Sequence, residues 1–115
     1  MNVNDRIKKI GESMGYDVAQ DLYHGKSPKN ITFTYEDETS GAFADNKAQT
    51  ETAYLMVSMN TPESYAYMED KKLLKTALEE KDFNVTSIRS WLEGNIKGIE
   101  KTRRTVFSVN ITQPV

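Results

Sequence analysis

ETAYLMVSMNTPESYAYMEDKKLLKTALEEKDF, the stretch from Glu51 to Phe83, contains two patterns that together decide the fold. Its first ten residues alternate between two faces, which is the period of two that a half-buried strand requires. Its second half places four apolar residues on one stripe of a helix: Tyr67, Leu74, Ala77 and Leu78. We therefore predict a strand at 51–60 that leads directly into a helix at 63–81, with Thr61 as the cap and Pro62 in the first helical turn.

The rest of the chain supplies elements that pair with this strand or pack on it. Apolar residues spaced by four, three and four predict a first helix at 4–14, which ends near Gly15. Alternation predicts three further strands, at 31–36, 85–93 and 101–111. The segment between the first helix and the first of these strands remains open: Tyr16, Val18 and Leu22 could form a short extended piece.

This order of elements predicts an α+β fold. Two helices would cover one face of a mostly antiparallel four-stranded sheet, in the order helix, strand, strand, helix, strand, strand. A chain of 115 residues is large enough for one domain with a real core, so we expect a single domain at 1–115. The side chains expected to be nearly buried are Leu55, Val57, Leu74, Leu78, Phe107 and Val109.

Composition limits the classes of function. The formal net charge of −2 argues against a general nucleic-acid-binding protein, which would carry a positive excess. The absence of cysteine excludes disulfides, thiolate metal sites and cysteine nucleophiles. The N-terminus lacks the apolar run of a signal peptide, and no segment is apolar enough to span a bilayer, so we expect a soluble protein made in the cytoplasm.

Residues with catalytic or metal-binding chemistry are few. The single histidine, His24, lies in a polar turn, and the sequence marks no partners for it. The acidic group at 36–45 lacks the spacing and the glycine of a calcium-binding EF-hand loop. No phosphate-binding glycine loop, nucleophile elbow or HExxH motif is present. We therefore expect no enzymatic activity, no cofactor and no metal.

Two groups of opposite charge stand out instead. The acidic group is part of a segment of about fifteen residues without periodicity, and we expect residues 38–50 of it to be mobile. The basic group surrounds the last hairpin, where it could also serve to guard a sheet edge. Four aromatic residues are compatible either with cross-strand pairs or with an interface: Tyr54, Tyr65, Tyr67 and Trp91.

Three segments carry a resemblance to a known family: ITFTYEDETSGAFADNKAQTETAYLMVSMNTPESY, LLKTALEEKDFNVTSI and the closing RRTVFSVNI. They contain an acidic strand end (YEDE), a polar loop with a DN pair, a Thr-Pro join, a helix that ends in LEE-x-x-F, and a closing strand of alternating Phe and Val. In this order they resemble small prophage and siphophage proteins of the tail-completion or tail-terminator group. The resemblance covers residues 5–112, and its specificity comes from the order of features, since none is a catalytic signature.

The resemblance implies a structural role in the virion. Subunits of such proteins assemble, usually as a six-fold ring, at the head-proximal end of the tail, where they stop tube polymerisation and meet the head connector. The implied partners are further copies of the chain, the major tail protein and the head-completion or connector protein, with no membrane and no specific nucleic acid. The implied location is the host cytoplasm during assembly and then the tail or neck of the virion.

Charge separation suits a ring, because a head-to-tail contact joins two different patches. We expect the acidic residues of one copy to meet the basic residues of the next. The expected interface residues are Glu36, Asp37, Glu38, Phe43, Asp45, Lys97, Lys101, Arg103 and Arg104. Two alternatives remain open: an adaptor module that binds one protein partner, and a non-catalytic ligand-binding α+β domain.

Overall fold

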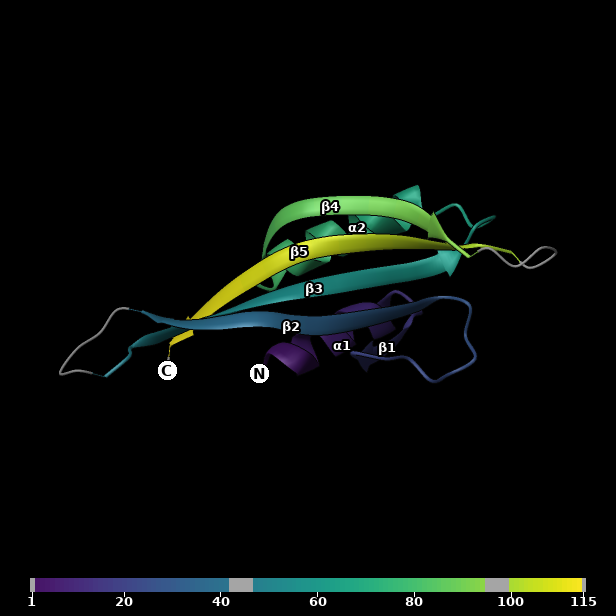
Figure 1. Ribbon diagram of the computed structural model, residues 1–115. Coiled ribbons are helices and arrows are strands. Elements are labelled where there is room, and N and C mark those ends of the chain that lie inside the picture. The colour runs from purple at the N-terminus through teal and green to yellow at the C-terminus, as the bar shows by residue number, and fades with distance from the viewer. Residues whose placement is uncertain (1, 42–46, 95–99, 115) are drawn as a thin grey trace.

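A computed structural model gives the fold (Figure 1) and describes residues 2–41, 47–94 and 100–114. The elements in chain order are α1 (Val3–Ser13), β1 (Asp17–Gln20), β2 (Asn30–Gly41), β3 (Thr50–Pro62), α2 (Met68–Glu80), β4 (Asn84–Glu93) and β5 (Thr102–Pro114). The strands form one sheet in the order β1-β2-β3-β5-β4, and both helices lie against the same face of it. The molecule is elongated, with extents of 61 × 25 × 24 Å.

The sheet corrects the predicted architecture. The α+β class holds, but the sheet has five strands and is mixed, so the prediction of a mostly antiparallel four-stranded sheet is wrong. The additional strand, β1, pairs in parallel with the first four residues of β2, from Asn30 to Phe33. Its sequence, DVAQ, is four residues long and has no alternation of its own. Pairing with β2 makes it a strand, because main-chain hydrogen bonds do not depend on side-chain periodicity.

The core lies between the sheet and the two helices. β3 and β5 are central strands, and their alternate residues face the helices, so they contribute much of the buried apolar surface. The six side chains that we expected to be buried are all at most 2% exposed, which confirms the predicted faces. Helix α1 contributes Ile7 and Ile10 to the same core, and α2 contributes Leu74 and Leu78.

The join between β3 and α2 differs from the prediction. Strand β3 continues through Thr61 and Pro62, which pair with Arg103 and Thr102 of β5. Helix α2 begins only at Met68, without a side-chain cap, so Thr61 does not cap it. Strand β2 begins at Asn30, opposite Asn60, so Pro62 has no partner on the β2 side. Its missing N–H is tolerated at this sheet edge.

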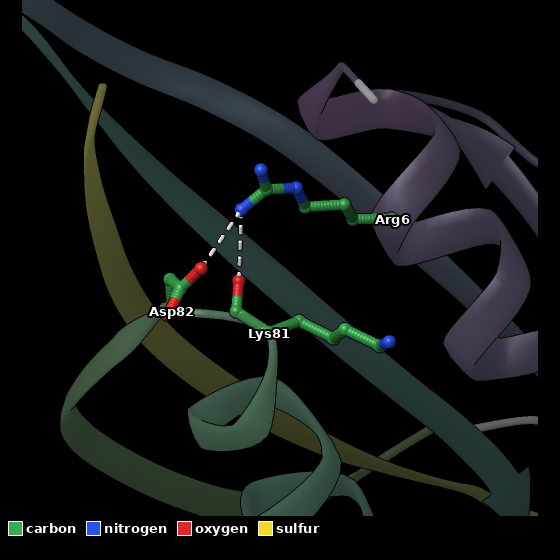
Figure 2. A network of polar contacts seen from close by, with 3 residues as sticks. All are labelled: Arg6, Lys81 and Asp82. Atoms are coloured by element: carbon green, nitrogen blue, oxygen red, sulfur yellow. Dashed lines mark hydrogen bonds and ion pairs between the residues drawn. The ribbon is translucent and has the colours of Figure 1, made fainter. Parts of the chain in front are cut away.

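The two helices are also linked by a polar contact (Figure 2). Arg6 of α1 donates from its Nη1 atom to the Lys81 carbonyl oxygen at 3.1 Å and to Asp82 Oδ2 at 3.5 Å. Lys81 lies at the C-terminal end of α2, where the carbonyl groups lack partners within the helix and a cation is favourable. The contact therefore fixes α1 relative to the end of α2.

Beyond the helices the sheet continues as an arm, which we define as residues 36–41 of β2, 50–54 of β3 and 110–114 of β5. Residues that we expected to form a mobile loop are paired here: Glu38–Gly41 lie opposite Thr50–Ala53. A register shift marks the start of the arm in β2, between Tyr35 and Asp37, and a second occurs in β4, between Val85 and Ser87. The two bulges lie in one row across the sheet, because Tyr35 pairs with Leu55, Leu55 with Val109, and Val109 with Val85.

Candidate functional site

The acidic residues form the outer side of the arm. Glu36, Asp37 and Glu38 are exposed in β2, and Asp37 accepts a hydrogen bond at its Oδ1 atom from the Glu38 amide at 2.9 Å. The three ion pairs found among residues 2–41, 47–94 and 100–114 involve none of these carboxylates. Their charges are thus directed to the outside of the molecule. Phe43 and Asp45, which we placed in the same group, lie outside the described residues.

The described members of the predicted basic group lie at the opposite end of the sheet, at the start of β5, where Thr102 pairs with Glu93 of β4 (Figure 1). Among the members that the structure describes, Lys101 alone has the expected outward character, because its side chain is exposed. Arg103 is half-buried, with its guanidinium 4.6 Å from the centre of the Tyr67 ring. Arg104 is also half-buried, and its Nη1 atom lies 3.5 Å from Glu93 Oε2. Lys97 lies outside the described residues.

Acidic residues at this end reduce its positive charge. Besides Glu93, Glu100 is exposed and accepts a hydrogen bond from the Ser64 amide at 2.6 Å. Hydrogen bonding from Ser64 holds the pKa of the Glu100 carboxyl below its ordinary value, so the carboxylate form is favoured. A further outward cation, Arg89, is exposed in β4 and was not predicted from the sequence. The only available signal was its place on the face of that strand opposite Ile88.

The four aromatic residues divide into two pairs. Tyr65 and Tyr67 are half-buried and contact Lys29 and Arg103 within the molecule. Tyr54, on the arm, and Trp91, in β4, are about two-fifths exposed, at 39% and 41%. The first pair therefore has a structural role, and the second pair remains available for an interface.

A polar cluster that the sequence did not reveal joins four segments. The Asp70 Oδ2 atom accepts hydrogen bonds from the hydroxyl groups of Tyr16 and Tyr65, at 2.6 and 2.7 Å. The Lys29 ammonium lies over both rings, 4.9 Å from the centre of Tyr16 and 4.7 Å from that of Tyr65. Burial raises the pKa of the Tyr16 hydroxyl well above its ordinary value, and the hydrogen bond to Asp70 raises it further.

This cluster is a closed structural contact. Tyr16 is 2% exposed, and its hydroxyl is occupied by Asp70. The Lys29 ammonium is stabilised by the faces of the two tyrosine rings, and the Asp70 carboxylate is stabilised by their two hydroxyl groups. The cluster therefore ties the start of β1, the start of β2, and the β3–α2 connection to the first turn of α2.

Two grooves lie along the arm. The first, of 310 Å³, is on the helix side, where Val3 and Tyr35 meet Ala53 and Ile111. The second, of 540 Å³, is on the uncovered face beside the bulges, and Asp37, Tyr54 and Asn110 contribute to its lining. His24 is exposed. Within the described ranges no three or more acidic, histidine or cysteine side chains are arranged to hold a metal ion.

Neither helix, within the part of the chain that the structure describes, has the length and apolar character needed to cross a membrane.

Comparison with known proteins gives information about the fold only. No family model matches the chain, and no curated protein matches it. Among solved structures, 22 chains match. One of them, whose description states no function, is similar over 98% of this chain and 87% of its own, with a TM-score of 0.52 and 11% sequence identity. At this identity the similarity extends to the fold and carries no activity or partner.

Proposed function

We propose that this protein is a structural subunit of a phage or prophage tail. Copies assemble as a ring, with six as the expected number, at the head-proximal end of the tail. The ring ends the growth of the tail tube and joins the tail to the head. Its partners are other copies, the major tail protein and the head-completion or connector protein, in the host cytoplasm during assembly and in the virion afterwards.

One observation carries this proposal alongside the family resemblance. The unpaired carboxylates of the arm and the outward cation Lys101 lie at opposite ends of an elongated sheet. A contact between such ends joins two different surfaces, so it repeats from copy to copy and can close only as a ring or continue as a filament. Exposed ion pairs contribute only about 0–1 kcal/mol each, so the isolated protein should be monomeric or weakly associated.

The test uses the tail tube as the template. Purified protein is added to polymerising major tail protein, and tube length and tube ends are followed by electron microscopy, with native mass spectrometry of the free protein. The proposal predicts rings on tube ends and an arrest of elongation. Wild-type protein that stays monomeric with tubes present, while the tubes keep growing, would contradict it.

A pair of variants tests the role of the arm charges. Asp37→Asn with Glu38→Gln removes two arm carboxylates and preserves the acceptor that Asp37 offers to the Glu38 amide. The control, Glu12→Gln with Glu80→Gln, removes two exposed carboxylates from the helices. The arm variant should form fewer rings at low salt, where exposed charges are least screened, and the control should match wild type.

A further inference from the structure

The sheet has two long edges without a strand partner in the described part of the chain. On one side, β1 covers only Asn30–Phe33, so the outer edge of β2 is free from Thr34 to Gly41. On the other side, β4 pairs with β5 alone, so its outer edge is free over ten residues. Such an edge presents unpaired N–H and C=O groups that can accept another strand.

These two edges lack three of the devices that prevent strand addition. Neither contains a proline or a lysine, and neither is short. The bulge in each strand interrupts pairing only locally, which leaves the regular segments Asp37–Gly41 and Ser87–Glu93. Five residues are enough for a strand of ordinary length.

We propose that β4 of one copy adds to the free edge of β2 in the arm of the next copy, so that the sheets of neighbouring subunits become continuous. This inference rests on the proposed ring and names a lateral contact within it, in which the arm of one copy lies beside Arg89 of the next and not beside the end that carries Lys101. Main-chain hydrogen bonds would supply attraction that salt does not screen, which exposed ion pairs cannot do.

The charges disfavour one alternative and favour this one. If two arms paired with each other, Glu36, Asp37 and Glu38 would face the same carboxylates of the second copy, and like charges opposite one another are destabilising. The β4 strand instead offers the exposed Arg89, and its acidic residue Glu93 lies at its end. The pairing of β4 with a second arm therefore joins opposite charges.

Strand direction and side-chain faces also agree. Three successive antiparallel pairings, from β2 through β3 and β5 to β4, make β4 run opposite to β2. If a second copy lies in the same orientation beside the free edge of β2, its β4 strand therefore runs antiparallel to β2. Asp37 pairs with Tyr54, and Arg89 pairs with Val106. These two partners precede Leu55 and Phe107, which face the helices, so Asp37 and Arg89 lie on the face without helices. If Arg89 lies opposite Asp37 of the next copy, Ser87 lies opposite its Thr39 on the same face.

Exposed apolar side chains provide independent support. Six large hydrophobic side chains are exposed among the described residues, and three of them adjoin these two edges. Trp91 and Leu92 lie on β4, and Tyr54 lies on β3 beside Asp37 of the arm. Adding the arm to β4 would place Trp91 and Leu92 at the new contact, one on each face of the sheet, with Tyr54 one strand away, and aromatic residues are enriched at interfaces.

Disulfide trapping tests the contact directly, because the chain has no cysteine of its own. Thr39→Cys and Ser87→Cys variants are mixed in equal amounts at high concentration and oxidised, and the products are separated by mass. We expect the mixed disulfide to exceed either homodimer at least tenfold. A control mixture of Ser87→Cys with Glu12→Cys, an exposed position on α1, should give only the yield of random collision.

A charge swap tests the register. Adding Arg89→Asp to the Ser87→Cys variant should abolish the excess of mixed product, and adding Asp37→Arg to the Thr39→Cys partner should restore it. Three outcomes would overturn the inference: an equal yield of Thr39→Cys homodimer, an equal yield of Ser87→Cys homodimer, or a mixed yield no higher than that of the control.

Failure of this contact can be told apart from failure of the proposed function. Rings on tail tubes without the mixed disulfide would overturn edge pairing and leave the tail role standing. A strong mixed disulfide together with tubes that continue to grow would support edge pairing and remove the tail role.

Discussion

Leu55 and Phe107 show how single residues hold this sheet to its helices. Both lie on central strands, at 1% and 0% exposure, and both belong to the one core cluster. Their burial follows from alternation alone, which is why the sequence predicted them correctly. Burial on the other face of the sheet could not be predicted from alternation. Thr32, Ser58 and Val106 are buried there although no helix covers that face.

Truncating either core residue should destabilise the fold. Leu55→Ala should lower the free energy of unfolding by about 2–5 kcal/mol and Phe107→Ala by about 3–5 kcal/mol, because each leaves a cavity that its neighbours fill only in part. Urea denaturation measures the change. Leu73→Ala is the control, since that side chain is 53% exposed and its loss should have little effect. Equal losses for the core and control variants would refute the assigned faces.

Tyr16 makes stability sensitive to alkaline pH. Its pKa is raised in the folded protein, so the folded state holds this proton more tightly than the unfolded chain does. Its contribution to stability is complete below the ordinary tyrosine pKa of about 10 and is lost as the pH rises above that value, by up to about 1.4 kcal/mol per pH unit. Tyr16→Phe should remove this part of the pH dependence.

Denaturation of wild type and Tyr16→Phe between pH 8 and about pH 11 measures this difference. At pH 8 the variant should be less stable, by about 1–3 kcal/mol, because the hydrogen bond to Asp70 is lost. The difference should narrow as the pH rises. Parallel curves across the whole range would show that Tyr16 does not titrate with unfolding.

At the scale of elements, the packing of α1 on β1 depends on the absence of a side chain. A Cβ atom at Gly11 would lie 2.3 Å from Cγ2 of Val18 and 3.2 Å from Cδ1 of Ile31. Helix α1 therefore approaches β1 more closely than any other residue at this position would allow. This approach holds β1 against the sheet edge although the strand has only four residues.

Gly11→Ala should therefore destabilise the protein, against the usual trend for helices. Alanine favours a helix interior over glycine by about 1 kcal/mol, but the clash with Val18 should outweigh this gain and cost a net of about 1–3 kcal/mol. Gly11→Ala combined with Val18→Ala should recover part of the loss. Thermal unfolding of the single and double variants gives the measurement, and a stabilised single variant would show that the helix can shift outward.

The sequence predicted elements well where side-chain period and burial coincide, and less well elsewhere. Strands β2, β3, β4 and β5 and both helices were anticipated near their observed positions. The extension of β2 to Gly41 was not, because the acidic run after Tyr35 has no apolar alternation. The start of α2 was misplaced because Thr61 and Pro62 resemble a helix start, whereas their pairing partners lie about forty residues away in β5.

At the scale of the whole molecule, two of the basic residues at one end of the sheet are engaged in contacts within the molecule, which the sequence did not indicate. The predicted group treated Arg103 and Arg104 as outward charges, but their contacts with Tyr67 and Glu93 lie far apart in sequence and could not be read from it. Of the acidic half of the predicted interface, the three described carboxylates, Glu36, Asp37 and Glu38, are exposed. Whether these residues meet in an assembly remains a prediction.

Lys101 and Arg103 should therefore differ when their charges are reversed. Lys101→Glu should leave the free energy of unfolding within about 0.5 kcal/mol of wild type, because its side chain is exposed. Arg103→Glu should cost about 1–3 kcal/mol, because it removes the contact with Tyr67 and places a carboxylate in a half-buried position. Urea denaturation and sedimentation velocity separate the two effects.

In that comparison, Lys101→Glu should fold normally and associate less than wild type at low salt. Arg103→Glu should lose stability whether or not the protein associates. Association of Lys101→Glu equal to that of wild type would show that this lysine does not contribute to contact between copies.

The pairing of β3 with β5 has a mechanical consequence. These strands are hydrogen-bonded in register over thirteen residue pairs, from Thr50 with Pro114 to Pro62 with Thr102. A pulling force applied between the arm and the far end of the sheet acts along these strands, at right angles to their hydrogen bonds. Under such shear the bonds of the central pair bear the load together, whereas a force that peels β4 sideways breaks them one after another. The molecule should therefore resist tension along its length far better than a transverse pull on its edge.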